Sequence, residues 1–249
     1  MPNTADAQQI LDLLLAHRSV RRFRPDAVPD EDVRRAVEAG QMASTSSNVQ
    51  GYCLIRVQDP IARERLAEIA GPQRKVVDSG AFFVVCGDTH RHRLIHERAG
   101  TPYRGRLEAF LVSVIDASLF AQNLCVAFEA MGYGICYVGG IRNDLREVDR
   151  TLRLPEGVYP LFGLCVGVPA EDPIPRPRLP LPAVLFDDRY PDAESLLAEI
   201  ERYDAEHARY LEARGSKPRP WTELMAGKYA EAQRVDVGPY YRSKGADLS

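Results

Sequence analysis

The segment HRSVR at residues 17–21 brings two guanidiniums, an imidazole and a hydroxyl into five consecutive positions. A planar guanidinium can hold two phosphate oxygens through parallel hydrogen bonds, and a serine hydroxyl and turn amides add further donors. These residue types predict a site for a phosphate monoester, whose expected contacts are His17, Arg18, Ser19, Val20 and Arg21. The alternative is a solvated basic turn, which the segment taken alone favours. Arg22 and Arg24 are expected to be solvated or structural in either case.

Two further segments have residue types that suit a bound ligand. In Tyr137-Val138-Gly139-Gly140 a short apolar strand leads into two glycines, which let backbone amides approach a ligand closely. An ordinary turn between a strand and a helix explains this motif equally well. Arg176-Pro177-Arg178 places two guanidiniums in a stiff, extended segment, which suits either a second phosphate clamp or an exposed linker.

Standard catalytic motifs do not occur in this sequence. It contains no GxSxG, HExxH, P-loop or GxGxxG pattern, so a dinucleotide site of the Rossmann type is not expected. His90, His92 and His96 lie among arginines with almost no carboxylate nearby, and a solvated loop explains them better than a metal site does. No metal is therefore expected.

Composition narrows the class of protein. The 249 residues carry a net charge of -3, which excludes a generally basic nucleic-acid-binding protein. No stretch approaches 18 consecutive apolar residues and the start of the chain does not resemble a secretory signal, so neither a membrane span nor secretion is expected. The five cysteines are odd in number and none has CxxC spacing, which favours buried thiols in a reducing compartment. A cytoplasmic protein is expected.

Hydrophobic periodicity predicts alternating helices and strands. Predicted helices cover residues 7–16, 29–42, 61–70, 106–131 and 193–213, and another begins near Asn143. Predicted strands cover 52–57, 82–87, 135–138 and 159–168, with an edge strand at 184–186. Residues 43–51 and 89–105 are polar and aperiodic and are interpreted as loops, the second as a lid. The pattern indicates an α/β or α+β sandwich whose apolar sheet is covered on both faces.

Two regions do not fit a simple sandwich. The helix at 106–131 is apolar nearly all round, which is typical of a helix in a core or a subunit interface. Six prolines lie between residues 169 and 182, so that stretch is extended and cannot join a central strand ladder. A strongly polar helix and a tail of low apolar content follow it. We expect this end of the chain to wrap a partner subunit.

In order along the chain, these segments resemble the nitroreductase superfamily, and within it the NADPH-preferring branch. The resemblance runs through HRSVRRF, ASTSSNVQG, GPQRKVV, and the segments at 116–144, 160–169, 175–185 and 210–221. It implies an α+β fold with a mixed central sheet flanked by helices. It also implies a single domain over residues 1–249, with 170–249 as an extension around the partner in a homodimer that binds FMN at its interface.

The resemblance also assigns residues. Beyond His17 to Arg21, it implies FMN contacts at Thr45, Gln73, Arg74, Lys75, Tyr137, Val138, Gly139, Gly140, Arg176 and Arg178. Arg214 and Arg219 match tail arginines that contact NADPH. The implied reaction is ping-pong transfer of two electrons from NADPH, preferred over NADH, through the flavin to nitroaromatics, quinones or free flavins. The flavin carries the chemistry and no catalytic side chain is required, with Arg21 in a supporting role.

This sequence departs from the family pattern at several positions. Arg176 stands where lysine is usual, Thr45 where serine is usual, and Asn48 where a bulky apolar residue often covers the flavin. The loop at 99–106 is longer. Two alternative functions follow from the same resemblance: a dedicated NADPH:FMN reductase that supplies reduced flavin, and a non-catalytic flavin-binding protein.

Overall fold

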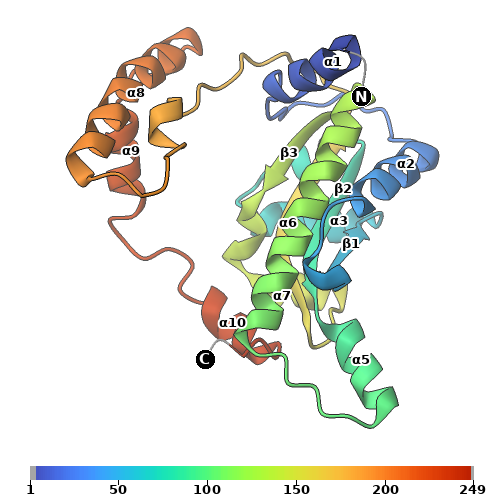
Figure 1. Ribbon diagram of the computed structural model, residues 1–249. Helices are drawn as coiled ribbons and strands as arrows, with labels where there is room; N and C mark the ends of the chain where they lie inside the picture. The colour runs from blue at the N-terminus through green and yellow to red at the C-terminus, as the bar shows by residue number, and fades with distance from the viewer. Residues whose placement is uncertain (1–3, 248–249) are drawn as a thin grey trace. The chain divides into compact units, whose positions relative to one another are not determined.

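A four-stranded antiparallel sheet organises the computed structural model, which describes residues 4–247 (Figure 1). Its strands are β1 (Tyr52–Arg56), β2 (Ala81–Asp88), β3 (Gly134–Val138) and β4 (Val158–Gly167), in the order β1-β2-β4-β3. Every pair of neighbouring strands is antiparallel. A parallel bridge joins Ser19 to Ile135, and this single contact supplies the only parallel pairing found among residues 4–247. The α+β fold predicted from the sequence is confirmed.

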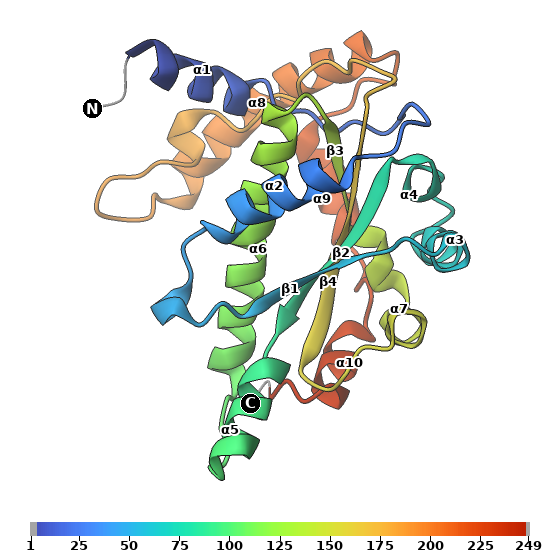
Figure 2. The same cartoon turned by 90° about the vertical axis from the view of Figure 1, so that its right-hand side faces the viewer.

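Helices cover both faces of the sheet, as Figure 2 shows in profile. On one face lie α2 (Asp30–Gln41) and α6 (Leu107–Ala130), and on the other α3 (Pro60–Ile69), α4 (Lys75–Asp78), the 3-10 turn η2 (Gly139–Asn143) and α7 (Leu145–Leu152). The alternation of side chains along β2 separates the two cores. Phe83 and Val85 face α6, whereas Phe82 and Val84 face α3.

Close packing holds α6 against the sheet and against α2. The ring of Phe120 stacks on Tyr52 with centroids 4.5 Å apart, and it leaves no room for a side chain at Gly40, where an added Cβ would lie 2.9 Å from the ring. Burial of a phenylalanine of this kind contributes about 1.5–3 kcal/mol to folding. These contacts explain why the predicted long apolar helix forms here.

The helix α6 also has the length and composition of a membrane span, with a mean hydropathy of 1.7 over its most apolar window. No such segment was expected from the sequence, because α6 does not contain 18 consecutive apolar residues. In the structure one side of α6 lies in the core, with Ala117, Phe120 and Leu124 buried. A core helix meets the same criterion, and α6 packs as one.

Two local expectations were wrong. Residues 89–105 contain a helix, α5 (His90–Ala99), rather than only a loop, and it ends at Gly100 in the left-handed conformation (φ 65°). Its polar sequence buries no residue, so hydrophobic periodicity could not reveal it. Residues 184–186 form no strand and follow the 3-10 turn η3 (Leu181–Ala183). The helix predicted to begin near Asn143 is α7, and its cap is Asp144, which accepts from Glu147 N at 3.0 Å.

The chain divides into two compact units. Unit 1 contains the sheet, and α1 (Thr4–Leu15), the short turn η1 (Ser46–Asn48), α5 and α10 (Val237–Ser243) belong to it. Unit 2 spans Ile174–Gln233 and holds η3, α8 (Ala193–Ala213) and α9 (Trp221–Lys228). The end of the chain returns to unit 1: Tyr240 and Tyr241 are buried in its core, and Tyr241 OH donates to Pro160 O at 2.7 Å.

Candidate functional site

The basic segment after α1 lies along the edge of the sheet. Val20 N donates to Ile135 O on β3, and Arg24 N donates to Val168 O just beyond β4, both at 2.9 Å. The Val20 side chain is buried against Gly134, where an added Cβ would lie 2.7 Å from Val20 Cγ2. Val20 therefore anchors the segment by packing, and its neighbour Arg21 is exposed.

Carboxylates hold the first two polar residues of this segment. His17 Nδ1 lies 2.8 Å from Glu129 Oε1 near the end of α6, so this nitrogen is engaged. Arg18 forms a two-pronged bond to Asp172 Oδ1, from Nε at 2.9 Å and from Nη2 at 2.5 Å. Neither acid was predicted from the sequence, because each lies more than a hundred residues along the chain from its partner.

Glu171 fixes the turn that follows. It accepts from the backbone N of Arg21 at 2.6 Å and from Arg22 Nε at 2.9 Å. Burial opposes its charge, but the hydrogen bonds from Arg21 and Arg22 outweigh burial and hold the pKa of Glu171 below its usual value. Arg22 is therefore structural, as expected. The Arg21 guanidinium reaches only Ser19 O at 3.2 Å and has no carboxylate partner within residues 4–247.

A cavity of about 580 Å³ adjoins this segment. Its lining includes His17, Arg18 and Val20 together with three carboxylates, those of Glu129, Glu171 and Asp172. The carboxylates offset the positive charge, so this cavity alone does not favour a dianion. Arg21 lies outside its lining and keeps its charge available.

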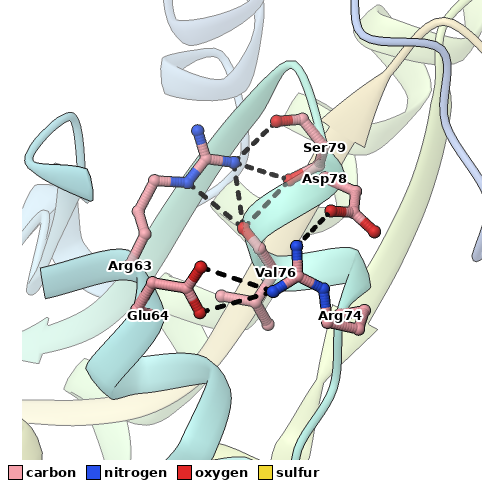
Figure 3. A network of polar contacts seen from close by, with 6 residues as sticks. All are labelled: Arg63, Glu64, Arg74, Val76, Asp78 and Ser79. Atoms are coloured by element: carbon pink, nitrogen blue, oxygen red, sulfur yellow. Dashed lines mark hydrogen bonds and ion pairs between the residues drawn. The ribbon is translucent and has the colours of Figure 1, made fainter. Parts of the chain in front are cut away.

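A second group of predicted contacts lies between α3 and α4. Figure 3 shows Arg74 bonded to Asp78 at 2.9 Å and to Glu64 at 3.3 Å, while Arg63 donates to Val76 O and Ser79 O. Arg74 is thus neutralised by two acids. Lys75 beside it makes no ion pair within the part of the chain that the structure describes.

The structure brings Gln73 together with the glycine pair. Gln73 Nε2 donates to Ala70 O at 2.5 Å, and a Cβ at Gly140 would lie 2.9 Å from this same nitrogen. Gly140 is therefore required for close packing of η2 on the end of α3. Tyr137 and Val138 precede it on β3. Val138 is buried, and burial raises the pKa of the Tyr137 hydroxyl far above its usual value.

Thr45 begins a strained loop between α2 and β1. Ser47, Asn48 and Gln50 all have positive φ, between 47° and 58°, a conformation that costs about 1 kcal/mol or more for each residue other than glycine. The buried Asp116 on α6 holds the loop, since it accepts from Ser46 N at 3.1 Å and from Gly51 N at 3.0 Å. The loop is pre-organised rather than relaxed.

The four remaining predicted arginines belong to unit 2. Arg176 and Arg214 both reach the hydroxyl of Tyr210, at 3.5 and 3.1 Å. Arg219 forms an ion pair with Glu223 at 2.6 Å. Arg178 shows no carboxylate partner among the described residues. The cations therefore fall into two groups: Arg18, Arg74 and Arg219 are paired with acids, and the others are available to an anion.

This set of free donors fits a ligand that carries phosphate. A phosphate needs guanidinium or ammonium donors that are not already neutralised. In unit 1 Arg21 and Lys75 meet that requirement, and in unit 2 Arg176, Arg178 and Arg214 do.

The three histidines of α5 have other partners. His90 Nδ1 donates to Glu156 O at 2.9 Å, His92 Nε2 donates to Val49 O at 3.0 Å, and His96 Nδ1 lies 2.9 Å from Thr101 Oγ1. Across residues 4–247 no group of three potential metal ligands occurs. The bond from His92 instead ties α5 to the strained loop.

Comparison with known proteins covers nearly all of the chain. Residues 14–168 match the Nitroreductase family, and residues 176–249 match the C-terminal domain of that family. An NADPH-dependent oxidoreductase from Staphylococcus haemolyticus is 41% identical over 92% of this chain and 94% of its own length. An FMN reductase (NADPH) from Bacillus subtilis is 38% identical over 94% of this chain and 97% of its own.

Solved structures agree with these matches. The NfrA1 nitroreductase from B. subtilis superposes with a TM-score of 0.93 at 37% identity, covering 96% of this chain and 100% of that one. The NADPH:FMN oxidoreductase from Vibrio harveyi, solved with NAD+, gives a TM-score of 0.88 at 34% identity over 96% and 99% of the two chains. This chain belongs to the nitroreductase family.

Proposed function

We propose that this protein is an FMN-dependent oxidoreductase that passes two electrons from NADPH to a nitroaromatic compound, a quinone or a free flavin. The observation that carries the proposal is the set of guanidinium and ammonium groups that no acid neutralises, in a chain related to an FMN reductase (NADPH) over 94% of its length. The overall reaction consumes NADPH, a proton and the acceptor, and yields NADP+ and the acceptor reduced by two electrons.

The residues of unit 1 bind and orient the flavin in this proposal. Arg21 and Lys75 are proposed to bind its phosphate through their positive charges. His17 and Arg18 are further proposed contacts, and their side chains are oriented by Glu129 and Asp172. Bound FMN supplies the redox chemistry, because its ring accepts a hydride equivalent and passes on two electrons. The other expected flavin contacts in unit 1 remain predictions: Ser19, Val20, Thr45, Gln73, Arg74, Tyr137, Val138, Gly139 and Gly140.

The arginines of unit 2 extend the same assignment. Arg176 and Arg178 are proposed to bind the flavin phosphate, and Arg214 and Arg219 the phosphates of NADPH. A 2′-phosphate distinguishes NADPH from NADH, so free guanidiniums in this unit favour NADPH. Arg219 must break its ion pair with Glu223 before it can bind a phosphate of NADPH.

A homodimer is part of this proposal. Leu107, Leu111, Ile115 and Leu119 recur every four residues along α6, and all are 37–55% exposed. They form an apolar stripe opposite the core side of the helix, which a second copy of the chain would cover. Residues 170–249 are proposed to extend around that partner, although residues 234–247 return to unit 1.

All five cysteines are free thiols, which supports the expected cytoplasmic location.

The related FMN reductase (NADPH) supports one second candidate, a dedicated reductase that supplies reduced flavin. Steady-state rates with FMN and with nitrofurazone as acceptors distinguish the two. Comparable turnover of both supports the broad oxidoreductase, and turnover of FMN alone supports the dedicated reductase. A purified protein that has no flavin absorbance and reduces neither acceptor would contradict both.

A further inference from the structure

Four of the five cysteines face one another in pairs across the sheet. Cys53 on β1 stands opposite Cys86 on β2, and Cys136 on β3 stands opposite Cys165 on β4. All four lie on the face of the sheet that packs against α3. Residues directly opposite on neighbouring antiparallel strands have Cβ atoms about 4.5–5.5 Å apart on the same face. Each of these sulfurs therefore has a second sulfur as its neighbour.

The spacing of Cys53 and Cys86 suits a disulfide. Two residues away along both strands, Asp88 N donates to Gly51 O at 2.8 Å. Hydrogen-bonded pairs recur at every second residue of an antiparallel ladder, so Cys53 and Cys86 form such a pair, with Cα atoms about 5.5 Å apart. Disulfides span Cα separations of about 4.4–6.8 Å. The backbone therefore already lies at a bonding distance.

The position of β1 in the sheet allows the two sulfurs to approach. Cβ atoms of a disulfide lie about 3.5–4.5 Å apart, so this pair must close by about 1 Å. The strand β1 is at the edge of the sheet and has β2 as its one neighbour, so it can move by that amount. A disulfide that displaces a strand is strained, and strained disulfides are easily reduced. The bond would therefore be reversible.

The two pairs differ in their access to solvent. Cys53 is partly exposed, whereas Cys86 and Cys165 are 0% exposed and Cys136 is 3% exposed. A dissolved oxidant reacts with a thiol that it can reach, so Cys53 is the first target among these four. The helix α6, with its exposed apolar stripe, covers the opposite face of the sheet, and a partner bound there would leave Cys53 uncovered.

The electrostatics assign different roles to the two thiols. Hydrogen bonding with Cys53, followed by burial, raises the pKa of the Cys86 thiol well above its ordinary value. Cys86 therefore keeps its proton and does not react with an oxidant by itself. It remains available as the second thiol, which attacks the oxidised sulfur of Cys53 and gives up its proton in that step.

We propose that Cys53 and Cys86 form a reversible disulfide when the protein meets a peroxide. The sulfur of Cys53 attacks one oxygen of hydrogen peroxide, the O–O bond breaks, and the products are a sulfenic acid and water. The sulfur of Cys86 then attacks the sulfur of Cys53, and the S–O bond breaks. The hydroxyl leaves with the proton of Cys86 as a second water. Two thiols lose two electrons, and the peroxide gains them.

The test treats the wild-type holoprotein with hydrogen peroxide and counts free thiols in denaturant. We expect the count to fall from five to three, and the intact mass to fall by about 2 Da as two hydrogens are lost. Peptide mapping should find Cys53 joined to Cys86, with Cys136 and Cys165 still reduced. Dithiothreitol should restore all five thiols.

Two variants separate this pair from the buried one. Cys53→Ala should keep its four remaining thiols at the same dose of peroxide, because Cys86 is shielded. Cys136→Ala is the matched control, since it removes one cysteine from the other opposed pair, and its count should fall from four to two. Thermal melting checks that each variant is folded. The peptide map of wild type decides the matter even if a variant does not fold.

Four results would overturn the proposal. They are five free thiols after treatment, Cys53 oxidised to a sulfinic acid with no bond to Cys86, a disulfide between two chains, and equal oxidation of the Cys136–Cys165 pair. The outcome does not depend on a bound flavin. A protein that forms the disulfide and binds no FMN would contradict the proposed function and leave this inference standing.

Discussion

Gly140 lies directly against the side-chain amide of Gln73, where an added Cβ would come within 2.9 Å of Nε2 and closer still to Ala70 O. The contact joins the glycine turn after β3 to the end of α3, two segments that the sequence assigned separately to the flavin. Glycine is required here by packing of protein on protein, whatever else approaches its amide.

Replacing this glycine should therefore weaken the fold as well as the site. We expect Gly140→Ala to lower the free energy of unfolding by about 1–3 kcal/mol, since backbone and side chain must shift to admit a methyl group. Urea denaturation measures this. Gly227→Ala is the control, because no atom lies within 4 Å of its added Cβ and alanine favours a helix. Equal stability of Gly140→Ala and wild type would contradict the packing argument.

Arg21 and Arg22 are adjacent arginines with different partners. Arg22 is bonded to Glu171, whereas Arg21 has only Ser19 O. We expect Arg21→Ala to weaken FMN binding about tenfold, the scale of one charge-assisted hydrogen bond. Arg22→Ala should retain FMN. Fluorescence of released flavin measures the FMN dissociation constant of each variant. Full FMN occupancy and unchanged turnover in Arg21→Ala would show that Arg21 is not part of the flavin site.

Glu171 predicts how stability responds to acid. Its pKa is held below the ordinary value of 4.5 in the folded protein, so its bonds stabilise the fold above that value. That contribution is lost as the pH falls from 4.5 through the lower folded pKa. The free energy of unfolding of Glu171→Gln should vary less than that of wild type over this range. Urea titrations across the acid range test this, and parallel curves would show that Glu171 is not responsible.

The exposed stripe on α6 predicts a subunit interface. We expect Ile115→Asp to shift the protein from dimer to monomer, because a carboxylate buried without a partner costs several kcal/mol. Analytical ultracentrifugation measures the mass. Ile61→Asp is the control, since Ile61 is also an exposed isoleucine but lies on α3. A dimer that persists in Ile115→Asp would place the interface elsewhere.

The sequence predicted the fold well in helices and strands whose burial leaves a recognisable pattern of apolar residues. The strand β2 was found because it is buried throughout and has a continuous apolar sequence, and the helix α6 because most of its residues are apolar. The helix α5 was missed because it buries nothing, and periodicity detects only buried faces.

The site was predictable only in part. Arginines, glycines and their order along the chain indicated a phosphate ligand. Glu129 and Asp172 could not be found, because ion pairs between distant residues leave no local pattern.

Anaerobic titration of the purified protein with NADPH tests the central assignment most directly. If FMN is bound and accepts electrons from NADPH, the flavin absorbance should bleach in stoichiometric proportion to added NADPH and return when a nitroaromatic or quinone is added. A flavin that stays oxidised in excess NADPH, or a protein without flavin absorbance, would contradict the account.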